Sequence, residues 1–165
     1  MARCATAKLT RIWRDTAITK KTKLRLLQSL VFPIATYAAE TWTIRSADRR
    51  RIDALEMWCY RRLLRVPWTA HRTNDSILKE LNVKKRLSTL LSQQFLKYFG
   101  HIARKPEAME KLIVEGKVDG RRPRGRSPSR WVDQLKSLTG ENLQQAIHHA
   151  EDRNSWKEVV KRVAS

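Results

Sequence analysis

The arginine-rich segment at residues 120–131 has the composition best suited to binding chemistry in this chain. It contains no acidic residue and five arginines, which are Arg121, Arg122, Arg124, Arg126 and Arg130. A guanidinium group can hold a phosphate through two parallel hydrogen bonds. Because glycine and proline interrupt the segment, it buries little surface alone and is expected to become ordered on an anionic partner. The alternative is a basic linker that stays in solvent.

A second group of arginines falls on the helix predicted for residues 46–66. On a projection of about 100° per residue, one arc of roughly 120° holds Arg50, Arg51, Trp58, Arg61, Arg62 and Arg65. The apolar residues occupy another arc, and the acidic Asp53 and Glu56 fall on the remaining side. Such a face suits a phosphate backbone, with an indole able to stack on a base or sugar. Alternatively, the arginines pair with acids elsewhere and Trp58 packs on a neighbouring helix.

The sequence lacks the patterns that catalysis or metal binding would need. No clustered carboxylates suit two-metal phosphoryl transfer, and no glycine-rich phosphate loop is present. The cysteines and histidines do not have zinc-ligand spacing. The adjacent His148 and His149 point about 100° apart on a helix. We therefore expect no enzymatic activity, no metal site and no cofactor.

The composition favours a polyanionic partner. Lysine and arginine total 35 against 16 acidic residues, which gives a net charge of +19. This charge predicts attraction to RNA or DNA. The most apolar run, residues 26–39, is too short to span a bilayer, so we expect no membrane association. Two cysteines without a pairing pattern and an N-terminus without an apolar signal core favour the nucleus or cytoplasm.

Helical spacing of apolar residues extends over almost the whole chain. Residues 19–41 form one predicted helix, with a kink or break near Phe32 because Pro33 lies inside it. The clearest helix spans residues 85–103, with an inward face predicted to contain Leu87, Leu90, Leu91, Phe95, Tyr98, Phe99 and Ile102. A later helix is expected to be capped by Ser129. The predicted fold is all-α, with two small helical units at 1–67 and 68–165 and a basic loop at 116–130.

The order of the sequence motifs resembles a known family. The motifs are Lys21-Thr22-Lys23-Leu24-Arg25-Leu26-Leu27, Val31-Phe32-Pro33-Ile34-Ala35-Thr36-Tyr37, Glu40-Thr41-Trp42, the segment 52–64, Arg72-Thr73-Asn74, Gly100-His101-Ile102-Ala103-Arg104, the arginine-rich segment and Asp152-Arg153-Asn154-Ser155-Trp156. Together they resemble the C-terminal part of endonuclease–reverse transcriptase polyproteins of RTE-type non-LTR retrotransposons. The resemblance implies that residues 1–67 form a helical thumb against the template–primer duplex. A C-terminal helical domain that grips element RNA or target DNA would follow.

The resemblance does not transfer catalysis, because the polymerase aspartates and the endonuclease of the family lie upstream of the matching part. We therefore expect a non-catalytic nucleic-acid-binding fragment of a retrotransposon reverse transcriptase that holds the RNA or DNA backbone. One alternative is a structural subunit of a large ribonucleoprotein, held by protein contacts or structural RNA. Another is a piece of an active reverse transcriptase separated from its palm. The sequence leaves open whether the ligand is RNA, DNA or a hybrid.

Overall fold

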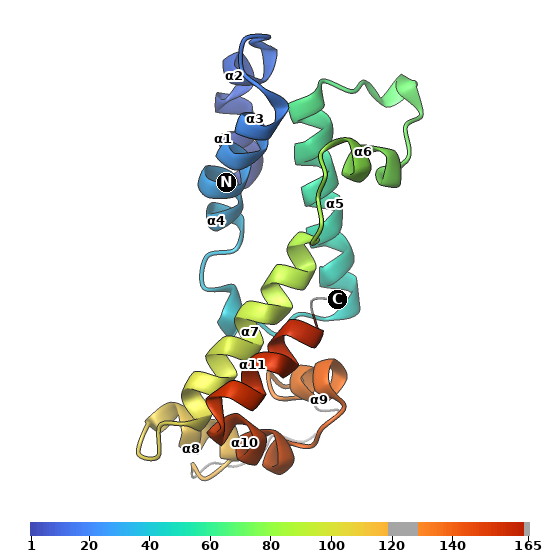
Figure 1. The fold of residues 1–165 in the computed structure, drawn as a ribbon. Coiled ribbons are helices and arrows are strands. Elements are labelled where there is room, and N and C mark those ends of the chain that lie inside the picture. The colour runs from blue at the N-terminus through green and yellow to red at the C-terminus, as the bar shows by residue number, and fades with distance from the viewer. Residues whose placement is uncertain (119–128, 164–165) are drawn as a thin grey trace. The chain divides into compact units, whose positions relative to one another are not determined.

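The structure is a computed structural model that describes residues 1–118 and 129–163. Within these residues the regular elements are helices and no strand occurs, which confirms the predicted all-α fold (Figure 1). The chain divides into two compact units, Met1–Tyr37 with Arg49–Ser88 and Ala38–Asp48 with Thr89–Ser165. These limits differ from the boundary at 67/68 expected from the sequence, because the segment after residue 67 packs within the first unit.

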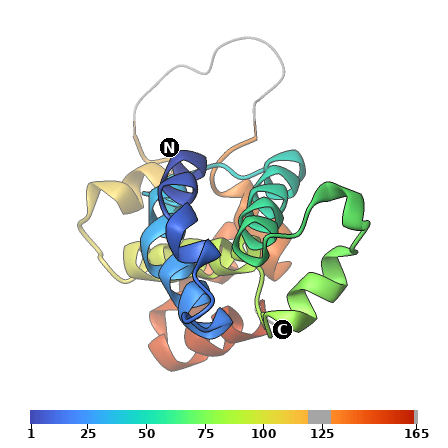
Figure 2. The same cartoon turned by 90° about the horizontal axis from the view of Figure 1, so that it is seen from above.

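The first unit is built around one long helix, α5. Its elements are α1 (Ala2–Lys8), α2 (Thr10–Arg14), α3 (Lys20–Leu26), a π-helical turn (Leu27–Val31), α4 (Phe32–Ala35), most of α5 (Ser46–Leu64), a 3₁₀ turn (Trp68–Ala70) and α6 (Asn74–Glu80). Helix α5 lies between the N-terminal helices and α6 in both views (Figures 1 and 2). One side of α5 therefore packs against the N-terminal helices and another side packs against α6. The remaining arc of the helix faces solvent.

The predicted helix at 19–41 changes its geometry where Pro33 enters. The π-helical turn Leu27–Val31 separates α3 from α4, and the Phe32 N–H donates to the Leu27 carbonyl. Pro33 has no N–H to donate, so an interruption of the ordinary hydrogen-bond ladder next to it is expected. The expected break near Phe32 is confirmed. The α-helix ends at Ala35 rather than Thr41, and Ala38 takes a left-handed conformation with φ of 52°.

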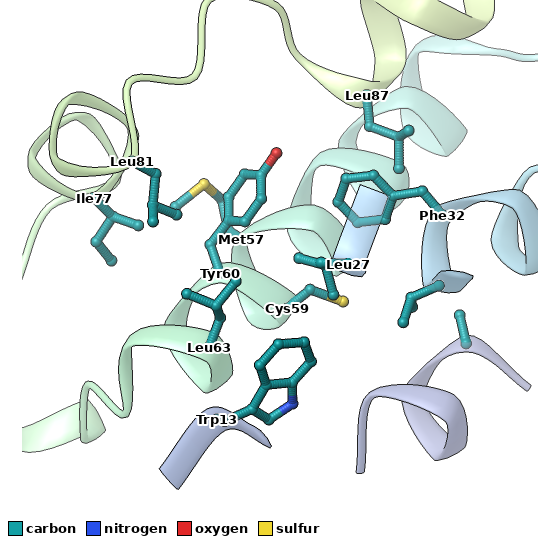
Figure 3. Packing of buried hydrophobic residues seen from close by; sticks show 12 residues of the cluster. Trp13, Leu27, Phe32, Met57, Cys59, Tyr60, Leu63, Ile77, Leu81 and Leu87 are labelled. Atoms are coloured by element: carbon teal, nitrogen blue, oxygen red, sulfur yellow. The ribbon is translucent and has the colours of Figure 1, made fainter. Parts of the chain in front are cut away.

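The core of the first unit gathers large side chains from several helices. Trp13, Leu27, Phe32, Tyr60 and Leu63 point toward one another and are almost completely buried (Figure 3). The Trp13 indole N–H donates to the Thr6 carbonyl over 2.9 Å. Full burial of such side chains is worth about 1.5–3 kcal/mol each. This packing fixes α2 against the C-terminal part of α5.

The acidic side predicted for α5 is not a solvent-exposed face. Glu56 is fully buried and accepts hydrogen bonds from the Tyr60 hydroxyl, the Leu87 N–H and the Arg86 guanidinium. Asp53 pairs with the same arginine at 3.5 Å. The buried arc of α5 is therefore wider than the apolar residues alone indicated, since the carboxylate is matched by a partner far along the chain.

The second unit surrounds the aromatic face of α7. It contains a 3₁₀ turn (Ala39–Thr41), most of α7 (Leu87–Ala103), α8 (Met109–Glu115), α9 (Asp133–Thr139), α10 (Leu143–Glu151) and α11 (Arg153–Arg162). Its core includes Phe95, Phe99, Leu135, Trp156 and Val160. The segment 38–48 joins this unit through the Trp131 indole, which donates to the Glu40 carbonyl over 2.9 Å. No helix in the described ranges is both long and apolar enough to span a bilayer.

Candidate nucleic-acid interface

One arc of α5 presents arginines to solvent. We define the α5 arginine face as Arg50, Arg51, Arg61, Arg62 and Arg65. All of them except Arg61 are exposed. The buried residues of α5, such as Cys59 and Leu63, lie on other arcs of the same helix. Four of these arginines lie on α5, which ends at Leu64 rather than at the predicted residue 66, and Arg65 directly follows the helix. A helix face of this kind can follow a phosphate backbone.

Three acids of the first unit are engaged with other cations. Asp53 and Glu56 pair with Arg86, while Glu80 pairs with Lys20 at 2.7 Å and with Arg72 at 2.6 Å. Within the described parts of the chain, Arg50, Arg62 and Arg65 form no ion pair with a carboxylate. The positive charge of these three side chains is therefore not neutralised by a neighbouring acid.

Two residues of the predicted site have partners inside the protein. The Arg61 Nη2 donates to the Arg72 carbonyl over 3.0 Å and to the Asn74 Oδ1 over 2.9 Å. Trp58 is half-buried against the core of the first unit. The Arg3 guanidinium carbon lies 5.5 Å from the centre of its ring. These contacts favour a structural part for Trp58 and a fixed orientation for Arg61.

The structure adds residues that the sequence did not indicate. A hollow of about 280 Å³ at the C-terminal end of α5 is lined by Thr10, Trp13, Arg14, Arg61, Arg62, Arg65, Val66 and Pro67. Arg14 comes from α2, so the four arginines that line the hollow come from α2, from the end of α5 and from the residue after it. A projection of α5 alone cannot reveal Arg14, because its proximity depends on how α2 packs.

Most of the predicted arginine-rich segment lies outside the described residues, namely Arg121, Arg122, Arg124 and Arg126. Arg130 is exposed and pairs with Asp133 at 3.3 Å. Its backbone N–H also donates to the Asp133 Oδ2 over 2.7 Å. This hydrogen bond lowers the pKa of the Asp133 carboxyl. Helix α9 begins at Asp133, so the predicted cap at Ser129 is wrong. The Asp133 carboxylate instead accepts the hydrogen bond from the Arg130 N–H in the turn before the helix.

Three polar side chains of the second unit have the hydrogen-bond order of a hydrolase triad. The His149 Nδ1 lies 3.0 Å from Glu141 Oε1, and its Nε2 lies 2.6 Å from Ser155 Oγ. A triad also needs N–H donors for the oxyanion that forms on the substrate. Near Ser155, the N–H of Asn154 is already bound by the Asp152 carboxylate, whose charge would oppose an oxyanion. The trio therefore joins α10 to α11 and provides no argument for catalysis.

Metal chemistry finds no support in the described residues, where no group of three histidine, cysteine or acidic side chains is placed to hold an ion. The two cysteines are free thiols, and burial raises the pKa of Cys59. A raised thiol pKa disfavours the reactive thiolate.

Comparison with known proteins indicates a relationship to mobile elements. The chain is 30% identical over 159 residues to an uncharacterized transposon-derived protein of Caenorhabditis elegans. The match covers 90% of this chain and 57% of that protein, so the chain spans little more than half of its relative. No protein-family model matches the chain, and no solved structure matches it significantly. The similarity supports a transposon origin.

Proposed function

We propose that this chain is a non-catalytic, nucleic-acid-binding part of a retrotransposon reverse transcriptase. It holds the RNA or DNA backbone through the α5 arginine face. The observation that carries this proposal is the exposure of Arg50, Arg62 and Arg65, on α5 and directly after it, with no carboxylate among the described residues paired to them. Backbone contacts of this kind give affinity with little sequence preference.

Further support comes from the whole chain and from its relative. The net charge of +19 is far larger than solubility requires, and a charge of this size attracts polyanions. The relative is transposon-derived, which agrees with the retrotransposon motifs of the sequence. A protein that binds element RNA or target DNA would act in the nucleus or cytoplasm.

The test is the salt dependence of binding to short RNA and DNA duplexes of unrelated sequence. If the protein neutralises about six to ten phosphates, log affinity falls against log salt with a slope of about −4 to −9. The variant R50Q/R62Q/R65Q removes three charges from the face. It should weaken binding to every sequence by a similar factor and make the slope shallower by about 2–3.

A matched control variant distinguishes the effect of losing the α5 arginine face from the effect of lowering the net charge. The variant K8Q/K21Q/R25Q removes the same charge from exposed positions of α1 and α3. It should retain more of the affinity than the face variant. A wild-type slope shallower than about −2, or equal losses in the two variants, would contradict the proposal.

A second candidate function is that of a structural subunit in a ribonucleoprotein. It is favoured by α8, which buries no side chain and exposes Met109 and Ile113 at 71% and 59%. Exposed apolar side chains grouped on one helix are typical of a protein-binding surface. Purification of the native protein distinguishes the two functions, because a subunit would remain with the same proteins after nuclease treatment.

A further inference from the structure

The geometry points to a second mode of anion binding at the C-terminal end of α5. We propose that the hollow lined by Arg14, Arg61, Arg62 and Arg65 takes the terminal phosphate of a nucleic-acid strand. This inference deepens the proposed function and rests on it. Arg61, Arg62 and Arg65 belong both to the α5 arginine face and to the hollow. The face would hold internal phosphates along the helix, and the hollow at its C-terminal end would recognise a strand end.

The walls of the hollow are preorganised. Trp13 is almost completely buried, and its indole N–H is bonded to the Thr6 carbonyl. The Arg61 guanidinium is oriented by two hydrogen bonds through a single nitrogen, Nη2, as described above. Its other N–H groups remain able to donate. A rigid floor and an oriented arginine reduce the entropy lost when an anion binds.

The size and charge of the hollow suit a small, doubly charged group. Its volume of about 280 Å³ lies below the range of about 300–1,000 Å³ typical of drug-sized ligands. No acidic side chain of the described residues lines it. A phosphate monoester carries a charge of about −1.5 to −2 near pH 7 and has three free oxygens. An internal phosphodiester carries only one charge, and the nucleic-acid strand must continue out of the hollow on both sides of it.

Arg65 provides an independent indication, because its backbone is one that glycine would normally adopt. Its φ is 57°, and it follows the last residue of α5. The Arg65 N–H donates to the Arg62 carbonyl and the Val66 N–H donates to the Arg61 carbonyl, which forms a Schellman motif. Glycine is favoured at this position, since a side chain there is sterically disfavoured. Strained residues of this kind concentrate at functional sites.

A purely structural explanation accounts for only part of this arrangement. Arginines in the last turn of a helix stabilise its negative end, which would explain Arg61 and Arg62. It does not explain why α2 brings Arg14 to the same place. Nor does it explain an arginine in the left-handed position, where glycine would close the helix with less strain.

The experiment compares a short single-stranded RNA carrying a 5′-phosphate, a 3′-phosphate or no terminal phosphate, each with an internal fluorophore. Wild-type protein should bind at least one phosphorylated form roughly tenfold more tightly than the unphosphorylated form. For each variant we compare the affinity for the phosphorylated RNA with that for the unphosphorylated RNA. Their ratio is unaffected by changes in affinity that all three RNAs share. The R14Q variant should bring the ratio close to one, while the exposed-site control K21Q should keep it.

The R65G variant separates binding from folding. Glycine relieves the left-handed strain, so the variant should melt roughly 2–4 °C higher than wild type while losing the preference for a terminal phosphate. An unchanged preference for the terminal phosphate in R65G, whatever its melting temperature, would overturn the inference. Equal wild-type affinity for all three RNAs would also overturn it but leave the proposed function intact. Failure of all three to bind would overturn both.

Discussion

The indole of Trp156 lies directly against the backbone of Gly100. A Cβ built at residue 100 would be 2.4 Å from the Trp156 Nε1, and this indole N–H donates to the Leu96 carbonyl over 2.8 Å. Directly after the end of α7, the Arg104 Nη1 donates to the Ala150 carbonyl over 2.8 Å. Two short motifs that are far apart in the sequence, 100–104 and 152–156, therefore meet in the core of the second unit.

The close approach predicts that Gly100→Ala destabilises the protein. The added methyl group would force Trp156 to move and would stretch or break its hydrogen bond to Leu96. Overpacking of a filled core typically costs about 1–3 kcal/mol. The measurement is the free energy of unfolding by urea, followed by circular dichroism. Lys97→Ala, at an exposed position of the same helix, should change it by less than about 0.5 kcal/mol. Equal stability of wild type and Gly100→Ala would contradict the packing.

The aromatic cluster of the second unit predicts a larger effect for Phe95→Ala. Phe95 is almost completely buried, and its ring centre lies 4.6 Å from that of Trp131. Its removal should cost about 3–5 kcal/mol in unfolding free energy. Leu90→Ala removes a large apolar side chain from the same helix at a position that is 38% exposed. Its cost should be clearly smaller, and similar losses for the two variants would show that the assigned inward face is wrong.

Helix α7 shows what the spacing of apolar residues could and could not predict. Leu87, Leu91, Phe95, Phe99 and Ile102 are buried as expected. The pattern gives the direction of the inward stripe because the helical period is fixed. It does not give the width of the stripe, which depends on the neighbouring helices. For this reason Leu90 is partly exposed and Tyr98 is half-buried, whereas Leu96 and Ala103 are buried without having been predicted.

The candidate site has the same limit. The exposed arc of α5 follows from the sequence because a single helix determines which residues share a face. The hollow does not, since Arg14 reaches it from another helix. The burial of Glu56 could not be predicted from the sequence either. An acidic residue is normally exposed, and only the distant partners Arg86 and Leu87 explain its burial.

The Glu56 network predicts a substantial loss of stability for Glu56→Gln. The amide keeps an oxygen that can accept from Tyr60 and Leu87, but it leaves Arg86 without its closest carboxylate. Because Arg86 is 31% exposed, water compensates part of this loss, and we expect a cost of about 1–3 kcal/mol. The double variant E56Q/R86Q should cost less than the sum of the two single variants, as measured by urea unfolding. Strict additivity would show that the pair is not coupled.

The last prediction concerns pH and Glu80. The hydrogen bond from Lys20, followed by that from Arg72, lowers the pKa of the Glu80 carboxyl in the folded protein. A lowered folded pKa means that the carboxylate stabilises the fold above its unfolded pKa of about 4.3. This stabilisation is lost as the pH falls from there through the lower folded value. Since the carboxylate is near the surface, each pair contributes about 0.2–1 kcal/mol.

Urea unfolding of wild type and Glu80→Gln between neutral and acidic pH measures this contribution directly. Wild type should be the more stable protein at pH 7, and its advantage should shrink as the carboxylate becomes protonated below about pH 4.3. Glu110→Gln removes an exposed carboxylate of α8 that has no ion pair in the described ranges, and it controls for net charge. An advantage that stays constant across this range would mean that Lys20 and Arg72 do not stabilise the folded carboxylate.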